Sequence, residues 1–496
     1  MKKFKLVLVG NGMAGIRTLE ELLKIAPEHY EITVFGAEPH PNYNRILLSP
    51  VLAGEQTLEE IVLNDWNWYH DNGITLHAGY QVTEINRIQR TVTATNKEGQ
   101  TITAAYDRLV LATGSNPFIL PVPGADLDGV IGYRDIADTQ AMIDAAERYT
   151  QAVVIGGGLL GLEAANGLSK RGMQVSVVHV NDWLMERQLD DVAGKMLQQS
   201  LQARGLNFLM QAHTQELLGD ANGRVRAVRF KDGREVPAQL VVMAVGIRPN
   251  TALAQSAHLH VDRGIVVSDT MQTVTDPRIY AVGECANHRG IAYGLVAPLF
   301  EQAKLLANHL AEWGIARYTG SLTSTKLKVT GIDLFSAGNF QGDADTETIV
   351  LRDPFAPGGG IYKKLVLKDN KLVGACLYGD TVDGSWYFKL LREGRSVADI
   401  RDRLIFGESN IGDSGHQGHN KASSMQDSDE VCGCDGVTNG TICKAIKEKG
   451  LFTLEDVRKH TKASASCGSC TGLVEQIMMF TAGGDYSAAP KTKAIC

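Results

Sequence analysis

The apolar and polar positions of the chain predict two similar strand–helix–strand units. Phe4–Val9 is a short, mostly apolar run, which is typical of a strand covered on both faces. Met13–Ile25 then carries apolar residues at helical spacing, and Glu31–Phe35 is a second apolar run. The same order returns in a later segment, at Ala152–Ile155, Gly161–Arg171 and Gln174–Val180. We therefore expect an α/β protein with two βαβ units.

Three further apolar runs predict strands that end in a glycine turn. They are Tyr106–Thr113 before Gly114, Leu240–Val245 before Gly246, and Ile279–Glu284, which ends in the pair Gly283-Glu284. The dipeptide Asp232-Gly233 predicts a hairpin turn among shorter strands. Residues from about 322 to 405 alternate strand and turn patterns and close with a short helix, so they predict a separate α+β unit.

The composition changes after this unit. Residues 408–430 are rich in Gly, Ser, Asn, His and Asp and contain few apolar positions, which predicts a flexible linker. Six of the eight cysteines follow residue 431, and we expect a small cysteine module at 431–482 and a disordered tail at 483–496.

Length and charge narrow the class of protein. A chain of 496 residues is too long for one core and predicts three or four domains. A net charge of −7 without a basic run predicts no nucleic-acid partner. The opening apolar run is too short for a signal peptide, and no apolar stretch is long enough to span a membrane. Clustered cysteines favour a reducing compartment, so we expect a cytoplasmic protein.

The first glycine motif predicts a dinucleotide site. Gly10, Gly12 and Gly15 lie between the first strand and the first helix, with the spacing G-x-G-x-x-G. Such glycines allow a tight turn, close approach of a pyrophosphate, and strand–helix packing. Glu38, just beyond the second strand, can bind a ribose hydroxyl.

The second motif repeats this spacing at Gly156, Gly158 and Gly161. His179 stands where an acid usually binds the ribose hydroxyls, which weakens the signal for NADH. A 2′-phosphate site needs arginines there, and Val180-Asn181-Asp182 supplies none. The sequence therefore favours NADH over NADPH.

Four cysteines form two close pairs in the last module. Cys432 and Cys434 are one residue apart, and Cys467 and Cys470 follow with the spacing C-x-x-C. Two thiolate pairs can hold Zn²⁺ or an iron–sulfur cluster. The one-residue gap fits zinc less well, so the cluster is favoured and structural zinc remains the alternative.

These motifs, with Ala112-Thr113-Gly114 and Gly283-Glu284, resemble the two-dinucleotide-domain flavoproteins. The resemblance implies FAD at the first glycine motif, with contacts from Arg45, Thr113, Gly114, Gly283 and Glu284. It implies a nicotinamide dinucleotide at the second motif, with Glu163 and Gly246 beside it. The family pairs this glutamate with a lysine just after a Leu-Ser pair, and here Pro50 follows Ser49. We therefore expect no lysine–glutamate pair, and an ordinary helix-surface acid is the alternative for Glu163.

Thiol-dependent chemistry is not expected in the flavin half. No cysteine precedes Cys285, which lies inside the predicted FAD turn. Disulfide-reductase and peroxidase activities therefore lack a nucleophile. Cys285 and Cys376 are expected as small buried residues, and Cys443 is not needed for a cluster.

Longer motifs carry a closer resemblance. They are Tyr43-Asn-Arg-Ile-Leu-Leu-Ser49, Leu184-Met-Glu-Arg-Gln-Leu-Asp190, Gly283-Glu-Cys-Ala-Asn-His-Arg-Gly290 and the cysteine module. In this order they resemble the N-terminal half of the large subunit of NADH-dependent assimilatory nitrite reductases. The module resembles the bacterioferritin-associated ferredoxin-like [2Fe–2S] domain. Full-length members continue into a sirohaem/[4Fe–4S] domain, so we expect this chain to be the electron-input half.

The resemblance implies a function and a domain order. We expect an NAD(P)H-dependent FAD oxidoreductase that passes electrons from NADH to FAD, to [2Fe–2S], and on to a nitrite or nitrate reductase domain or subunit. The alternative is an NADH oxidase whose cysteine module docks a partner. A homo-oligomer is compatible with either, and no catalytic residue is assigned. The expected order is FAD-binding 1–115 and 246–320, NAD(P)H-binding 116–245, α+β reductase domain 321–405, linker 406–430, [2Fe–2S] domain 431–482 and tail 483–496.

Overall fold

The computed structural model describes residues 3–312, 314–329, 331–410, 422, 425–433, 435–451, 453–466, 468 and 470–481. The chain forms two compact units, Met1–Ile405 and Phe406–Cys496. The described part of the first unit contains two five-stranded parallel sheets, a five-stranded antiparallel sheet and smaller sheets of two or three strands, and that of the second contains a strand pair and short helices.

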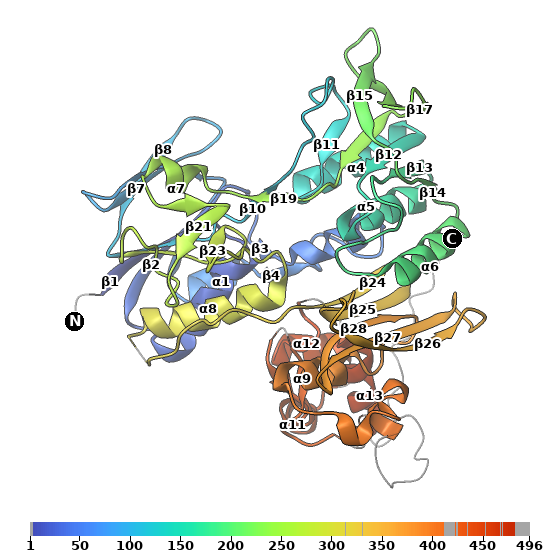
Figure 1. Ribbon diagram of the computed structural model, residues 1–496. Coiled ribbons are helices and arrows are strands. Elements are labelled where there is room, and N and C mark those ends of the chain that lie inside the picture. The colour runs from blue at the N-terminus through green and yellow to red at the C-terminus, as the bar shows by residue number, and fades with distance from the viewer. Residues whose placement is uncertain are drawn as a thin grey trace. The chain divides into compact units, whose positions relative to one another are not determined.

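A parallel five-stranded sheet in the order β22-β9-β1-β2-β5 opens the first unit. Its strands are β1 (Phe4–Val9), β2 (Tyr30–Gly36), β5 (Ile74–Ala78), β9 (Arg108–Leu111) and β22 (Ile279–Ala281). β1 lies between β2 and β9, and its Leu6 and Leu8 are fully buried, as expected for a strand covered on both faces. Helices α1 (Met13–Ile25) and α8 (Val296–Leu310) pack side by side (Figure 1, blue and yellow).

A second parallel sheet has the order β11-β18-β12-β13-β14. Its strands are β11 (Val130–Gly132), β12 (Gln151–Ile155), β13 (Gln174–Val178), β14 (Asn207–Leu209) and β18 (Leu240–Met243). Its helices are α4 (Ile136–Arg148), α5 (Leu159–Lys170) and α6 (Asp191–Gln202). β12 occupies the central place that β1 has in the first sheet, so the chain repeats one architecture.

In each half, the chain forms a three-stranded antiparallel sheet between two strands of the parallel sheet, after β5 in the first half and after β14 in the second. The first contains β6 (Gln81–Asn86), β7 (Thr91–Thr95) and β8 (Thr101–Ala105), and the second contains β15 (Thr214–Gly219), β16 (Val225–Phe230) and β17 (Glu235–Pro237). The predicted turn at Asp232-Gly233 joins β16 to β17, and Gly233 has a φ of +85°. This turn is confirmed.

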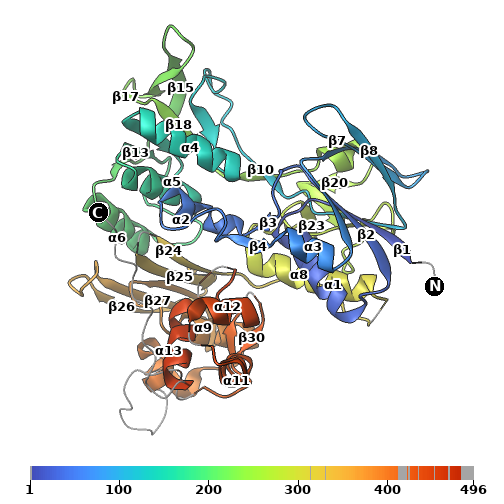
Figure 2. The same ribbon diagram turned by 180° about the vertical axis from the view of Figure 1, so that it is seen from behind.

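Short elements complete this part of the unit. The first half adds β3 (Asn42–Tyr43), β4 (Val62–Asn64), a 3-10 turn Arg45–Leu47, α2 (Leu48–Leu52) and α3 (Trp66–Asp71). β10 (Ser115–Pro117), just before the second parallel sheet, pairs with β19 (Ile247–Pro249), just after it. The chain then forms α7 (Ala252–Ser256), β20 (Val261–Asp262), β21 (Gly264–Val267) and β23 (Ala286–His288). Figure 2 shows α2 beside α5, and these helices are in contact. The contact is close because a Cβ on Gly167 would lie 2.6 Å from the Leu52 side chain.

The predicted α+β unit is confirmed as an antiparallel sheet with the order β24-β25-β28-β27-β26. Its strands are β24 (Ser324–Val329), β25 (Ile332–Gly338), β26 (Glu347–Asp353), β27 (Ile361–Lys368) and β28 (Lys371–Tyr378). Helix α9 (Gly384–Glu393) contacts β25 and β28, and 3-10 turns follow at Ala398–Ile400 and Leu404–Phe406.

The second unit contains a strand pair and three helices among its described residues. They are β29 (Glu430–Cys432), β30 (Val437–Thr438), α11 (Asn439–Lys449), α12 (Leu454–Thr461) and α13 (Thr471–Thr481). Thr438 and Thr453 cap α11 and α12 by accepting a backbone N–H, and Ile442, Val457 and Val474 form the core. A 3-10 turn at Glu408–Asn410 begins the expected linker. Most of that linker and the tail from residue 482 lie outside the described residues.

Several predicted strands end earlier than expected. β13 ends at Val178 rather than Val180, β18 at Met243 rather than Val245, and β22 at Ala281 rather than Glu284. The residues just beyond β13 and β22, His179 and Val282, stay buried. An apolar pattern therefore continues past the last ladder hydrogen bond.

Asp190 links the second parallel sheet to the antiparallel sheet. It caps α6 by accepting the Ala193 N–H at 3.1 Å. Its Oδ2 also accepts the Tyr362 hydroxyl at 2.7 Å and the Lys364 ammonium at 3.2 Å. The side chain of Asp190 is only 8% exposed, so these partners replace water.

We expect Asp190→Ala to lower the free energy of unfolding by roughly 3 kcal/mol, because a helix cap is lost and buried polar partners are left unpaired. The neighbour Asp191 is exposed and forms an ion pair with Lys195, one turn along α6. Asp191→Ala should therefore change stability by less than about 0.5 kcal/mol. Urea unfolding of both variants measures the difference. Equal losses would contradict the role given to Asp190.

Candidate functional site

The first glycine turn is shaped by its backbone. Gly10 has a φ of +112°, and a Cβ there would lie 2.2 Å from the Ala112 carbonyl oxygen. A Cβ on Gly15 would lie 2.9 Å from the Gly10 carbonyl oxygen. A Cβ on Gly12, by contrast, would meet nothing within 4 Å. The outer glycines are thus required by packing, and Gly12 faces open space.

The second turn has the same geometry. Gly156 has a φ of +123°, and its Cβ would lie 2.3 Å from the Ala244 carbonyl oxygen. A Cβ on Gly161 would lie 1.9 Å from the Gly156 carbonyl oxygen, whereas Gly158 meets nothing within 4 Å. The residues at the carboxyl ends of β9 and β18, Ala112 and Ala244, therefore play equivalent parts.

Both turns lead directly into a helix with no side-chain cap. Gly12 and Gly158 are the N-cap residues of α1 and α5, and neither helix has a capping side-chain hydrogen bond. The N–H groups of the first helical turn are the donors that a pyrophosphate accepts. Open space beside an uncapped helix N-terminus therefore fits a dinucleotide at each turn.

Charged residues predicted at the first turn lie together. Glu38 accepts the Tyr43 hydroxyl at 2.7 Å and a guanidinium N–H of Arg45. Arg45 also donates to the Arg134 carbonyl oxygen at 2.8 Å, and Arg134 forms an ion pair with Glu284. The predicted residues Glu38, Arg45 and Glu284 thus belong to one network.

The remaining predicted residues shape the same region. Gly114 has a φ of +65°, and its Cβ would lie 3.6 Å from the Arg134 guanidinium. Thr113 donates its hydroxyl to the Asn250 carbonyl oxygen at 2.7 Å. Gly283 has a φ of +91°, and its Cβ would lie 2.9 Å from Ala14 on α1.

Sequence reasoning missed two residues in this region, Asn11 at the glycine turn and Arg134 in the charged network. Asn11 accepts the Tyr69 hydroxyl at 2.7 Å and donates to the His40 carbonyl oxygen at 3.1 Å, so it anchors the glycine turn. Its place inside the glycine motif was an available signal. Arg134 is far from every motif in sequence, and its contacts with Glu284 and Arg45 in the folded chain identify it.

Glu163 is not an ordinary helix-surface acid. The Ser49 hydroxyl donates to its Oε2 at 2.6 Å, and the Tyr133 hydroxyl donates to Ser49 at 3.2 Å. Burial raises the pKa of Glu163 to about 7, although the Ser49 hydrogen bond acts in the opposite direction. No lysine directly follows Ser49 in this chain, and Glu163 contacts the uncharged Ser49 hydroxyl, which accepts from Tyr133, so burial dominates the pKa of Glu163.

His179 follows β13 directly and is buried against the second turn. The Gly157 N–H donates to its Nδ1 at 3.1 Å, and its Nε2 lies 3.1 Å from Glu186 Oε2. The pKa of Glu186 is lowered, chiefly by the hydrogen bond to His179. The other predicted residue of this site, Gly246, follows β18 with a φ of +113° and has open space at its Cβ.

Two of the four predicted cluster ligands are described, and they are adjacent. Cys432 and Cys470 are buried and share a hydrogen bond, which is the main cause of the raised pKa of Cys432. Cys434 and Cys467 lie outside the described residues. Within the described part of the chain, no group of three or more His, Cys, Asp or Glu side chains could hold a metal ion, since half of the expected set is missing there. Two buried thiols at one point fit half of a thiolate site.

The other described cysteines have different surroundings. Cys285 and Cys376 are fully buried, as expected, and burial raises the pKa of the Cys376 thiol to about 12. Cys443 contacts Asn439 on α11 and Thr481 on α13, so it joins these two helices.

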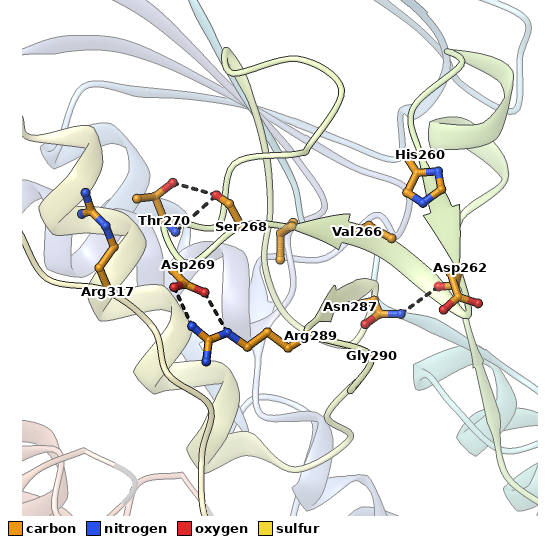
Figure 3. A pocket seen from close by; sticks show the side chains of 11 residues that line it. His260, Asp262, Val266, Ser268, Asp269, Thr270, Asn287, Arg289, Gly290 and Arg317 are labelled. Carbon is orange, nitrogen blue, oxygen red and sulfur yellow. Dashed lines mark hydrogen bonds and ion pairs between the residues drawn. The ribbon is translucent and has the colours of Figure 1, made fainter.

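A separate open cavity of about 620 Å³ lies beside β21 and β23 (Figure 3). Arg289 and Asp269 form a two-point ion pair in its wall, at 3.0 and 2.7 Å. None of the residues predicted for the cofactor sites lines this cavity. The described part of the chain has no helix long and apolar enough to cross a membrane.

The fold and sites are those of a flavoprotein reductase with an iron–sulfur module. It has two parallel sheets with glycine turns that fit dinucleotides, an antiparallel α+β domain and a small helical module with paired thiols. Residues 4–308 match the family described as pyridine nucleotide-disulphide oxidoreductase. Residues 324–395 match the rubredoxin NAD+ reductase C-terminal domain, and 430–479 match the BFD-like [2Fe–2S] binding domain. The chain belongs to the pyridine nucleotide-disulphide oxidoreductase family, so it is an oxidoreductase that uses FAD, NAD(P)H and a [2Fe–2S] cluster.

Relatives of known function support the closer resemblance. The chain is 49% identical to the nitrite reductase [NAD(P)H] of Bacillus subtilis, over 100% of this chain and 60% of the relative. It is 46% identical to the assimilatory nitrate reductase electron transfer subunit of Bacillus subtilis, over 100% of this chain and 62% of the relative. A solved putidaredoxin reductase–putidaredoxin complex is 27% identical with a TM-score of 0.73, covering 82% of this chain and 97% of that one. The predicted resemblance and fold class are confirmed.

We expect Gly12→Val to abolish FAD binding without unfolding the chain. The φ of Gly12 is −87°, which valine adopts, and no protein atom would meet its Cβ. The side chain would therefore occupy only the space of the pyrophosphate. Gly158→Val, with a φ of −82°, is the matched variant and should retain FAD but lose NADH binding. Flavin content and circular dichroism test both. A Gly12→Val protein with full flavin would overturn the first-site assignment.

We expect Glu163 to make stability depend on pH. Its pKa is 4.5 in the unfolded reference and about 7 in the folded chain. Between these values the unfolded chain has released the proton and the folded chain retains it, so the free energy of unfolding falls as pH rises. In the parental chain the free energy of unfolding should fall by about 1–3 kcal/mol between these pH values because of Glu163. Glu163→Gln should not show this fall, and above about pH 7 the two profiles should run parallel. Urea unfolding at a series of pH values measures this, and profiles that are already parallel between these pH values would refute it.

Proposed function

We propose that the chain takes electrons from NADH at the second glycine turn and passes them through FAD to the [2Fe–2S] cluster. The cluster then supplies a nitrite or nitrate reductase catalytic domain or subunit. The observation that carries this proposal is the matched pair of open, uncapped helix N-termini at Gly12 and Gly158 in a chain that also has a cysteine module. When bound, FAD supplies the conversion between a two-electron hydride and single electrons.

The proposed roles follow the residues at each turn. FAD is assigned to Gly10, Gly12, Gly15, Glu38, Arg45, Thr113, Gly114, Gly283 and Glu284. NADH is assigned to Gly156, Gly158, Gly161, Glu163, His179 and Gly246, and the cluster to Cys432, Cys434, Cys467 and Cys470. The domain borders given above are proposed with them, supported by the separate parallel sheets built from strands of residues 4–111 and 279–281 and of residues 130–243.

In the proposed reaction, the chain's own residues bind and orient the cofactors, and none acts as a nucleophile. No cysteine precedes Cys285, and Cys285 is fully buried with a raised pKa. Glu163 lies on α5 just after the second turn, and with its pKa of about 7 it can hold or release a proton near neutral pH. A direct transfer without a protein thiol fits this arrangement.

The acceptor is proposed from the relatives. One is named a nitrite reductase and the other an electron transfer subunit of nitrate reductase. The chain spans 60% and 62% of their lengths. Both names fit a chain that delivers electrons to a catalytic centre elsewhere. A cytoplasmic location is proposed with this role, because clustered thiols favour a reducing compartment.

We expect Cys470→Ser to lose the cluster but retain NADH–ferricyanide activity. Cys470 is buried beside Cys432 in the second unit, and the glycine turns belong to the first. Ferricyanide can take electrons from flavin directly, whereas reduction of cytochrome c should fall at least about tenfold. Cys443→Ser is the matched control, since Cys443 lies in the same module and contacts Asn439 and Thr481. Cytochrome c reduction at the parental rate by Cys470→Ser would favour the docking-module alternative.

A further inference from the structure

The second turn lacks an acid at the place where the first has one. The Gly10 N–H donates to the Phe35 carbonyl oxygen and the Gly156 N–H to the Val178 carbonyl oxygen, each at 2.8 Å. Phe35 and Val178 are therefore equivalent positions. Counting on from them, Asn181 is the counterpart of Glu38 and His179 of Gly36. Neither Asn181 nor His179 carries a carboxylate for a ribose hydroxyl.

A segment farther along the chain folds back onto this turn. The Met185 N–H donates to the Gly157 carbonyl oxygen at 3.0 Å, and Met185 has a φ of +56°. The Leu184 side chain lies 2.7 Å from the place of a Cβ on Gly157. These contacts fix the next residue, Glu186, beside the glycine turn.

The carboxylate of Glu186 is oriented by a chain of hydrogen bonds. The Gly157 N–H donates to His179 Nδ1, so Nε2 carries the ring proton and donates to Glu186 Oε2. His179 is buried, and the Glu186 side chain is 28% exposed. The carboxylate of Glu186 is thus held beside His179, and the hydrogen bonds from His179 and from the backbone N–H of Glu186 favour its charged form.

We propose that Glu186 determines the nucleotide specificity of the second turn. Its carboxylate accepts the 2′-hydroxyl of the adenosine ribose of NADH and repels the 2′-phosphate of NADPH, and His179 is the positioning residue. This inference rests on the proposed role of the second turn as the NADH site. A carboxylate is the usual acceptor for a ribose hydroxyl at such turns, and here it comes from seven residues beyond His179.

The positive charge near Glu186 does not create a binding site for the 2′-phosphate of NADPH. Arg187 is exposed and contributes to the lowered pKa of Glu186 by its charge. A single arginine beside a carboxylate is partly neutralised by it, whereas a 2′-phosphate site needs uncompensated arginine donors. Asp182 lies in the same loop and is exposed.

The test compares NADH, 2′-deoxyadenosine NADH and NADPH in the full-length flavoprotein. Ferricyanide reduction gives kcat/KM for each nucleotide, and calorimetry with ADP-ribose gives an affinity that does not depend on turnover. The variants are Glu186→Gln, which keeps the size of the side chain, and Asp182→Asn, which removes the same charge from the same loop. Retained flavin content shows that each variant is folded.

The parental protein should prefer NADH over its 2′-deoxy analogue by about tenfold or more, as expected for a hydrogen bond to a charged group. Glu186→Gln should reduce that ratio several-fold, weaken ADP-ribose binding and raise the relative activity with NADPH. Asp182→Asn should leave the ratio unchanged.

An unchanged ratio in Glu186→Gln, or a parental preference for NADPH, would overturn the role of Glu186. A parental protein that is reduced by neither nucleotide would instead contradict the proposed function itself.

Discussion

The structure depends on two turns in which the backbone must approach itself without side chains. Between β1 and α1, a Cβ on Gly15 would lie 2.9 Å from the Gly10 carbonyl oxygen, and between β12 and α5 the equivalent distance is 1.9 Å. Only glycine allows a helix to begin this close to a buried strand. Because no side chain covers these helix starts, their N–H groups stay available to an anion. The packing constraint and the binding site are therefore one feature.

The two turns are anchored by different side chains in the same space. In the first, Asn11 lies against Gly36, and its side chain bonds to Tyr69 and His40. In the second, Gly157 leaves room for the His179 ring, which accepts the Gly157 N–H. The exchange of a large and a small residue between turn and strand end preserves the volume. It also gives each turn its own surroundings, with Arg45 near the first and Glu186 near the second.

Local sequence patterns predicted the strands and helices. They could not predict side-chain contacts between residues that lie far apart in the chain. The glycine spacing and apolar runs located β1, α1, β12 and α5 because each depends on residues that are close in the chain. The hydrogen bond of Ser49 to Glu163 joins residues 114 positions apart, and the pair Arg134–Glu284 joins residues 150 apart. No spacing rule relates such positions, so the contact of Glu163 with Ser49 could not be predicted from the sequence. Strand ends also shifted, because His179 and Val282 remain buried after the ladder ends.

The central claim is that one chain carries electrons from NADH to an iron–sulfur centre. Anaerobic addition of NADH to the purified protein, followed by visible absorption and electron paramagnetic resonance, tests it directly. The flavin bands and the broad iron–sulfur absorption should both bleach, and the signal of a reduced [2Fe–2S] centre should appear. Bleaching of the flavin alone, with an iron–sulfur centre present but still oxidised after excess NADH, would contradict the account.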